Sequence, residues 1–246
     1  MKFDAQTTKS SPANQARAVF SGLTAALFDL DNTLIETHID FPAMKQRTLD
    51  LVAEHDISVE PFLELDVLSI VDAATELLRA RSTASDVATD FHNRAFRMLA
   101  AIEEEECANP TELPGAREFL ERLHQNQISI GIVTRNCRAV SERLIVHGRL
   151  PCDVLLARED VPRTKPDPVH LLTALEVLGA RKPAARAADT CVMVGDHWMD
   201  VMAGRNAGMR TVGLLRGRPE PFFAPAPPDL LVRDMEELGA LVPSGF

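Results

Sequence analysis

The stretch AALFDLDNT at residues 25–33 decides the fold of this 246-residue chain. Its first four residues are an apolar run of the kind that forms a buried strand, and two aspartates follow within three positions. Similar apolar runs, separated by segments with helical periodicity, recur at residues 128–133, 154–156, 191–194 and 211–215, and a last short strand and helix are expected within 230–241. Because strands that alternate with helices form β-α-β units, we predict a Rossmann-like α/β core, a parallel sheet with helices on both faces.

One interval is too long for a single crossover helix. Residues 42–55, 62–80 and 85–102 have helical patterns, and no strand pattern interrupts them. We therefore expect an inserted helical domain over residues 37–110. It contains fifteen acidic and six basic residues, so its charge of −9 accounts for nearly all of the chain's −10.

The residues outside the insertion are expected to form the core and an N-terminal extension. The core is expected to comprise residues 23–36 and 111–246, and residues 1–22 form an N-terminal extension that can be flexible. The proline-rich stretch at residues 219–228 is expected to be a surface loop.

Composition excludes several classes of protein. A net charge of −10 argues against a nucleic-acid-binding surface, which must be basic. The longest strictly apolar run has five residues, 98–102, whereas a membrane span needs about 20. Residues 1–22 lack the apolar stretch of a secretory signal, and the four cysteines lie far apart, as in proteins of a reducing compartment. We expect a cytoplasmic monomer or homodimer that binds neither nucleic acid nor membranes.

Polar residues follow three of the predicted strands. Asp29 and Asp31 come after the first, Thr134 follows the second, and Asp196 and Asp200 come after the strand at 191–194. Ligands bind at the carboxyl ends of parallel strands, so we expect these side chains to meet there. Crowded carboxylates repel one another, and Mg²⁺ is the usual cation that two such groups and a phosphate oxygen bind. The sequence therefore predicts a magnesium site at this edge.

A lysine in a rigid turn supplies a positive charge for the same site. In the stretch TKPDP at residues 164–168, Pro166 restricts Lys165 to an extended conformation, and Asp167 can cap the helix that follows. Thr134 stands near the start of a helix, where backbone N–H groups favour anions. Acids, a hydroxyl and a lysine together indicate a phosphate-binding site.

These residues form four motifs in order, and the order resembles that of the haloacid dehalogenase-like (HAD) superfamily. The motifs are FDLDNTL at 28–34, Thr134, KPDP at 165–168 and GDHWMD at 195–200. The insertion after the first motif resembles the α-helical cap of that family, and the chain is most similar to its phosphoglycolate phosphatase group. Asn32 stands where glycine is more usual, and asparagine tolerates the same turn conformations.

The resemblance implies a role for each residue. Asp29 would be the nucleophile that forms an aspartyl-phosphate, and Asp31 the general acid and base. Thr134, Arg135 and Lys165 would bind the phosphoryl group of a small phosphorylated substrate. Mg²⁺ would be held by Asp29, the main-chain oxygen of Asp31 and Asp196, with Asp200 as a ligand through water or as a partner of Lys165.

Several other functions share this family's fold. A dehalogenase lacks the second acid, and a phosphonatase lacks it too and needs a lysine in the cap, so Asp31 argues against both. A phosphomutase shares the full set of residues and is the main alternative. A catalytically inactive binding module is the other, although such a protein usually loses at least one of the key groups.

One run of acidic residues stands outside the motifs. Residues 103–106 are four consecutive glutamates. A helix would distribute them around its axis, so we expect a solvated helix end there and no metal site.

Overall fold

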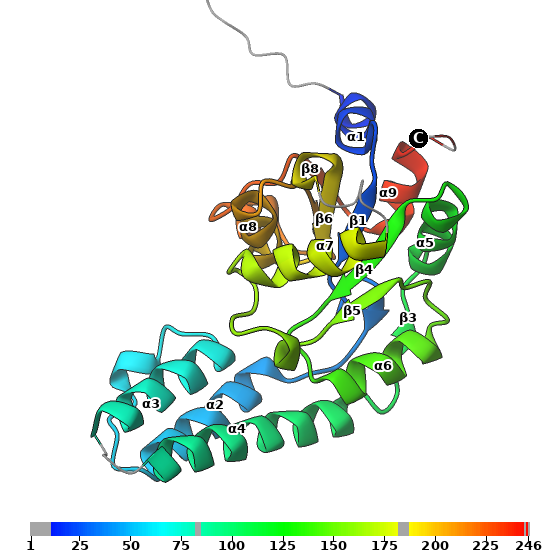
Figure 1. Ribbon diagram of the computed structural model, residues 1–246. Coiled ribbons are helices and arrows are strands. Elements are labelled where there is room, and N and C mark those ends of the chain that lie inside the picture. Colours follow the sequence, from blue (N-terminus) through cyan, green and yellow to red (C-terminus); the bar gives the residue numbers. More distant parts are fainter. Residues whose placement is uncertain (1–10, 82–84, 182–186, 244, 246) are drawn as a thin grey trace, which may run out of the picture. The chain divides into compact units, whose positions relative to one another are not determined.

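The computed structural model of the chain describes residues 11–81, 85–181, 187–243 and 245. Among them, six strands form a parallel sheet in the order β5-β4-β1-β6-β7-β8 (Figure 1). The prediction of a Rossmann-like α/β core with an inserted helical segment is confirmed. The strands are β1 (Ala25–Phe28), β4 (Ser129–Val133), β5 (Val154–Leu156), β6 (Cys191–Gly195), β7 (Arg210–Leu214) and β8 (Leu230–Val232).

β1 occupies the centre of the sheet because every one of its residues is apolar and can be buried on both faces. It pairs in parallel with β4 on one side and β6 on the other, so that Leu27 lies opposite both Gly131 and Met193. A Cβ atom at position 131 would lie 2.5 Å from Leu27 Cδ2, so any larger residue there would force this leucine to move. The position of β1 places the residues that follow it in the middle of the sheet's carboxyl edge.

Alternation along β1 directs its side chains to two separate layers of helices. Leu27 belongs to a buried cluster with Leu171 and Met193, on the face covered by α7 (Val169–Arg181) and α8 (Trp198–Asn206). Phe28 points the other way and meets the ring of Phe119 edge to face at 6.3 Å, on α5 (Ala116–Gln125). Asp29 continues this alternation, which predicts that its side chain lies on the α7 and α8 side.

Part of the segment expected to be an extension is a helix that packs on the core. α1 (Pro12–Phe20) buries Ala16, Val19 and Phe20 and contacts β8 and α9 (Met235–Leu241), beside which Figure 1 shows it. These three apolar residues have helical i, i+3, i+4 spacing, but the helix is short and its other positions are mostly polar. Residues 1–10 lie outside the described residues.

The chain leaves and re-enters this unit through a short antiparallel pair. β2 (Ile35–Glu36) lies opposite β3 (Thr111–Glu112), with Glu36 facing Thr111. Contacts separate the described residues into two compact units, one up to Glu36 and from Pro110 onward, and the other Thr37–Asn109. α6 (Arg138–His147), between β4 and β5, belongs to the first unit.

The second unit contains α2 (Phe41–Ala53), α3 (Val67–Arg81) and α4 (Ser85–Glu106). α4 buries Phe91, Ala95 and Leu99 at four-residue spacing, which forms a continuous apolar stripe. The helix predicted from residue 62 begins five residues later, because Asp66 accepts hydrogen bonds from the backbone N–H groups of Leu68 and Ser69 and caps α3 there.

Two expectations about exposure hold only in part. Glu103 is only 3% exposed, so the glutamate run is not solvated throughout: the helix turns its first member inward and leaves Glu104 and Glu105 in solvent. The proline-rich stretch is not simply a surface loop either, since Phe223 and Ala226 are buried against Val201 of α8. Among the described residues, no helix combines the length and apolar character that crossing a membrane requires.

Candidate active site

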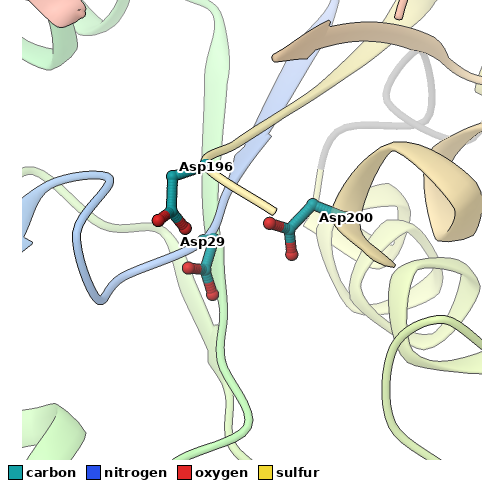
Figure 2. Close-up of side chains that lie close together, drawn as sticks. All are labelled: Asp29, Asp196 and Asp200. Atoms are coloured by element: carbon teal, nitrogen blue, oxygen red, sulfur yellow. The ribbon is translucent and has the colours of Figure 1, made fainter. Parts of the chain in front are cut away.

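Three aspartates from separate segments meet at the carboxyl end of the sheet. Asp29 follows β1, and its backbone N–H donates to Val194 O at 2.9 Å, which holds it beside the end of β6. Asp196 follows β6, and Asp200 lies in the first turn of α8. Figure 2 shows their three carboxylates directed toward one another, and one ligand oxygen from each lies within 4.8 Å of the others.

The start of α8 fixes the position of Asp200. His197 N–H donates to Asp200 Oδ2 at 3.0 Å, and Met199 N–H donates to His197 Nδ1 at 3.2 Å. A Cβ atom at Gly195 would overlap the Asp200 carboxylate. The glycine of the GDHWMD motif therefore has a packing role, since it makes the space that Asp200 fills.

Lys165 joins two of these acids and a strand end. Its Nζ donates to Asp29 Oδ1 at 2.6 Å, to Val133 O at 2.7 Å, and lies 2.8 Å from Asp200 Oδ1. The lysine is 2% exposed, so these three partners replace its water. Burial by itself lowers the pKa of Lys165, but Asp200 and Asp29 outweigh that effect and raise the pKa, which keeps the ammonium charged.

The carboxylates at the site are hard to ionise together. Burial raises the pKa of Asp29 well above its usual range; Lys165 opposes this rise, and the neighbouring carboxylates add to it. The pKa of Asp196 is raised to about 6, by burial first and then by the charge of Asp200. Each added positive charge at this place therefore favours the ionised acids.

Asp31 lies beside the same edge and is held by an asparagine that the sequence analysis did not select. Asn136 Nδ2 donates to Asp31 Oδ2 at 2.5 Å, and both side chains are buried. The expected turn after the first motif is present, since Asn32 has a φ of 55° in the left-handed region. Asn136 follows Thr134 by two positions, but no spacing rule links it to an acid 105 residues earlier.

Thr134 and Arg135 occupy the end of β4. Thr134 is buried, its N–H donates to Leu156 O at 2.9 Å, and its Oγ1 accepts from Asn136 N–H at 3.2 Å. Arg135 is half-buried, with Nη1 3.2 Å from Met199 Sδ at the start of α8. The helix expected to start near Thr134 begins at Arg138, four residues after it.

A buried histidine connects Thr134 and Lys165. His170 donates from Nε2 to Leu156 O at 3.2 Å, the same oxygen that accepts from Thr134 N–H, and its Nδ1 accepts from Lys165 N–H at 3.4 Å. Burial first, and then the charge of Lys165, lowers the pKa of His170 to about 3. The ring is therefore neutral, with one nitrogen donating and the other accepting. It follows the KPDP motif by two positions, and that proximity was the only signal in the sequence.

A second cation reaches the site from the turn that precedes the proline-rich stretch. Arg218 Nη1 donates to Asp196 Oδ2 at 2.8 Å and to Asp196 O at 2.7 Å. Nothing in the spacing of residues 216–228 distinguishes this arginine from an ordinary surface residue. Its contact with Asp196 depends on the turn that follows β7, which only the folded chain shows.

The order and placement of these motifs agree with comparisons to known proteins. Residues 26–214 match the family profile described as haloacid dehalogenase-like hydrolase. The chain belongs to this family. The predicted family resemblance is thereby confirmed.

Relatives and solved structures agree with that assignment. A pyrophosphatase PpaX of Bacillus velezensis is 32% identical over 195 residues, 78% of this chain and 83% of that protein. A predicted phosphoglycolate phosphatase from Haemophilus somnus has a TM-score of 0.59 at 18% identity, covering 91% of this chain and 99% of the other. A β-phosphoglucomutase from Clostridium difficile has a TM-score of 0.60 at 16% identity, covering 88% and 93%. The two structures show the shared fold, and the predicted enzyme class, a hydrolase of the phosphatase type, is confirmed.

Proposed function

We propose that this hydrolase is a Mg²⁺-dependent phosphatase that cleaves a small phosphomonoester through an aspartyl-phosphate. One observation carries the proposal: Asp29, at the end of the central strand, contacts Lys165 at 2.6 Å and shares a cluster with Asp196 and Asp200. A nucleophilic carboxylate, a phosphate-binding cation and acids for a metal ion are the parts that phosphoryl transfer to an aspartate needs.

The donor set suits a hard divalent cation. Asp29, Asp196 and Asp200 offer carboxylate oxygens close enough to share one ion, and Mg²⁺ prefers such ligands. Among the described residues, Lys165 and Arg218 are the basic side chains that contact these three carboxylates, so one negative charge is left for a bound cation to offset. Asp29, Asp196 and the main-chain oxygen of Asp31 would hold the ion, with Asp200 supporting them. When bound, it would neutralise charge on the phosphoryl oxygens.

The first chemical step is assigned to Asp29 and Asp31. A carboxylate oxygen of Asp29 attacks phosphorus, the bond from phosphorus to the ester oxygen breaks, and Asp31 gives its proton to that oxygen. Lys165 opposes the protonation of Asp29 and thereby favours the nucleophilic form. Thr134, Arg135 and Lys165 are the proposed ligands of the phosphoryl oxygens.

The second step restores the enzyme. Asp31, now ionised, takes a proton from a water molecule that attacks the aspartyl-phosphate, so phosphate leaves and Asp29 is a carboxylate again. Asn136 donates a hydrogen bond to Asp31 Oδ2, which orients this acid for both proton transfers. Both steps therefore use the same proton carrier in opposite directions.

The inserted helices supply the proposed substrate selection. We propose that residues 37–110 are a cap and that residues 23–36 and 111–246 form the catalytic core. A cap excludes water from the reaction and contacts the leaving group. Its charge of −9 disfavours strongly anionic polymers, which favours a small metabolite. Phosphoglycolate is the first candidate from the family resemblance, and pyrophosphate is added because of the PpaX relatives.

Phosphate release from a panel of substrates tests this function. The panel comprises phosphoglycolate, pyrophosphate, sugar monophosphates and p-nitrophenyl phosphate, each with Mg²⁺ and with excess chelator. We expect Mg²⁺-dependent release from at least one small substrate and none from D29N. A protein that releases no phosphate from any of them, or releases it equally well with chelator, contradicts the proposal.

A phosphomutase remains the second candidate, because the β-phosphoglucomutase structure shares this fold. The products separate the two activities. Conversion of a sugar phosphate to its isomer, without release of inorganic phosphate, would favour the mutase. Release of phosphate as the main product would favour the phosphatase.

A further inference from the structure

Arg218 is held against a carboxylate that the proposed function assigns to a metal ion. It donates to both the side chain and the main chain of Asp196, at 2.8 Å and 2.7 Å. The Asp196 side chain is 7% exposed and that of Arg218 is 34% exposed, so solvent screens the pair only from the arginine side. Arg218 is therefore a positive charge directly at the acidic cluster.

The conformation of the turn after β7 places the Arg218 side chain beside Asp196. Arg216 and Gly217 both have positive φ, 47° and 80°, and Arg218 N–H donates to Leu215 O at 2.8 Å. The guanidinium then lies over the ring of Phe222, 4.7 Å from its centre. Phe222 in turn meets His197 edge to face at 5.0 Å. Arg218 thus lies between an aromatic ring and Asp196, in a conformation that its neighbours stabilise.

We propose that Arg218 is a built-in counter-cation that weakens the binding of a divalent cation to Asp29, Asp196 and Asp200, and so sets the affinity of the site. This inference rests on the proposed function, in which that cation is Mg²⁺. Arg218 donates to Oδ2 of Asp196, so the guanidinium and a bound cation would share this one carboxylate. Two cations on one carboxylate repel each other, and each reduces the charge that the other experiences.

The alternative role for Arg218 is to orient Asp196, and it predicts the opposite change in the affinity for the cation. If Arg218 mainly held Asp196 in place, its removal would weaken cation binding. If it acts as a counter-cation, its removal strengthens cation binding, because the carboxylate regains its full charge. The sign of the change in affinity therefore decides between the two.

Binding of the metal alone provides the test, with no substrate present. R218M keeps the length of the side chain and removes its charge, R218K keeps the charge, and R216M is the matched control. Arg216 lies in the same turn but pairs with Glu36 at 3.2 Å, away from the acidic cluster. Free Mn²⁺ is followed by electron paramagnetic resonance at pH 8, and Mg²⁺ is then added as a competitor.

We expect R218M to bind both cations roughly tenfold more tightly than the wild type, with R218K and R216M within about twofold of it. R218Q gives the same test if R218M does not fold, as judged by its thermal unfolding. Equal or weaker binding by folded R218M and R218Q overturns the inference and leaves the proposed function standing. A wild-type protein that binds neither cation overturns both, and phosphate release that resists chelator overturns the proposed function separately.

Discussion

Two groups of four carboxylates have nearly the same composition and very different surroundings. Asp29 and Asp31 come from one segment of the chain and Asp196 and Asp200 from another more than 160 residues later, and the fold of the sheet gathers them at one edge. The run 103–106 is contiguous, and α4 distributes it so that Glu103 is buried while Glu104 and Glu105 face solvent. Separation along the chain is therefore a poor guide to separation in space.

The comparison also shows what a carboxylate needs in order to stay buried. Lys165 and Arg218 compensate the aspartates, and raised pKa values of Asp29 and Asp196 report how incompletely they do so. Glu104 and Glu105 face solvent, where water screens their charges. A group of acids that folding desolvates is under electrostatic stress, and binding a cation relieves that stress.

The sharpest way to break the comparison is to remove one charge from each group. D29N deletes the proposed nucleophile and should lower kcat/KM by at least about a thousandfold, because the covalent route is lost. E105Q deletes a solvent-facing charge of the run and should leave kcat/KM within about twofold of the wild type. Steady-state kinetics on the best substrate of the panel checks both, and an active D29N that is correctly folded would remove the nucleophile assignment.

A second experiment tests how Asp31 is held within the buried group. N136A removes the hydrogen bond to Asp31 Oδ2 and should lower kcat/KM for an alkyl phosphate by about 10- to 100-fold. The loss should be smaller for p-nitrophenyl phosphate, whose leaving group needs little protonation. N126A, on an exposed asparagine at the end of α5, is the control. Equal losses on both substrates would show that Asn136 does not act through Asp31.

The cost of burying these carboxylates can be measured from the pH dependence of the free energy of unfolding. The pKa of Asp196 in the folded protein, about 6, lies above its usual value, so the folded state binds a proton more tightly than the unfolded state. This contribution stabilises the fold below about pH 4 and is lost as pH rises through 6. With chelator at pH 8, D196N should therefore gain about 2 kcal/mol over the wild type in the free energy of unfolding.

The same variant should show little gain at pH 4, where Asp196 is protonated in the folded protein. Denaturant unfolding at the two pH values checks the sign, with E105Q as the variant that should change stability at neither. A wild type that is more stable than D196N at pH 8 in chelator would contradict the burial argument.

The smallest expected effect lies at the end of the glutamate run. Glu106 Oε2 accepts from Asp40 N–H at 2.6 Å, at the start of α2. E106A removes this acceptor and should cost about 0.5–1 kcal/mol of unfolding free energy, whereas E105A should cost less. Thermal unfolding of the two variants side by side would show whether the run contributes to structure only through this residue.

Much of this architecture could be predicted from the sequence because apolar runs and strand-end residues obey local rules. The strand at residues 25–28 was recognisable from its four apolar residues, and the aspartates from their places after strands. Arg218, Asn136 and His170 could not be found in this way. Asn136 and Arg218 meet acids that lie 105 and 22 residues away in the sequence, and no spacing rule predicts such contacts. His170 lies only five residues from Lys165, but its contacts depend on how the turn and the helix pack, which a local pattern does not show.

The helix α1 was not predicted, although its local pattern was present in the sequence. Its three buried residues were visible in the sequence at helical spacing, but nine residues with a mostly polar surface make a weak pattern. Its stability comes from contact with β8 and α9, which lie more than 200 residues away. Local propensity alone therefore underestimates a short helix that the rest of the core supports.

The pairing of Glu36 with Thr111 has a consequence for the length of the inserted segment. Because the chain departs and returns at two residues that already face each other, the inserted segment adds no strain at its junctions, whatever its length. A change in the length of the intervening segment is therefore expected to leave the paired ends, and the sheet beyond them, in the same register. This short ladder separates the backbone geometry of the α/β unit from the size of what is inserted into it.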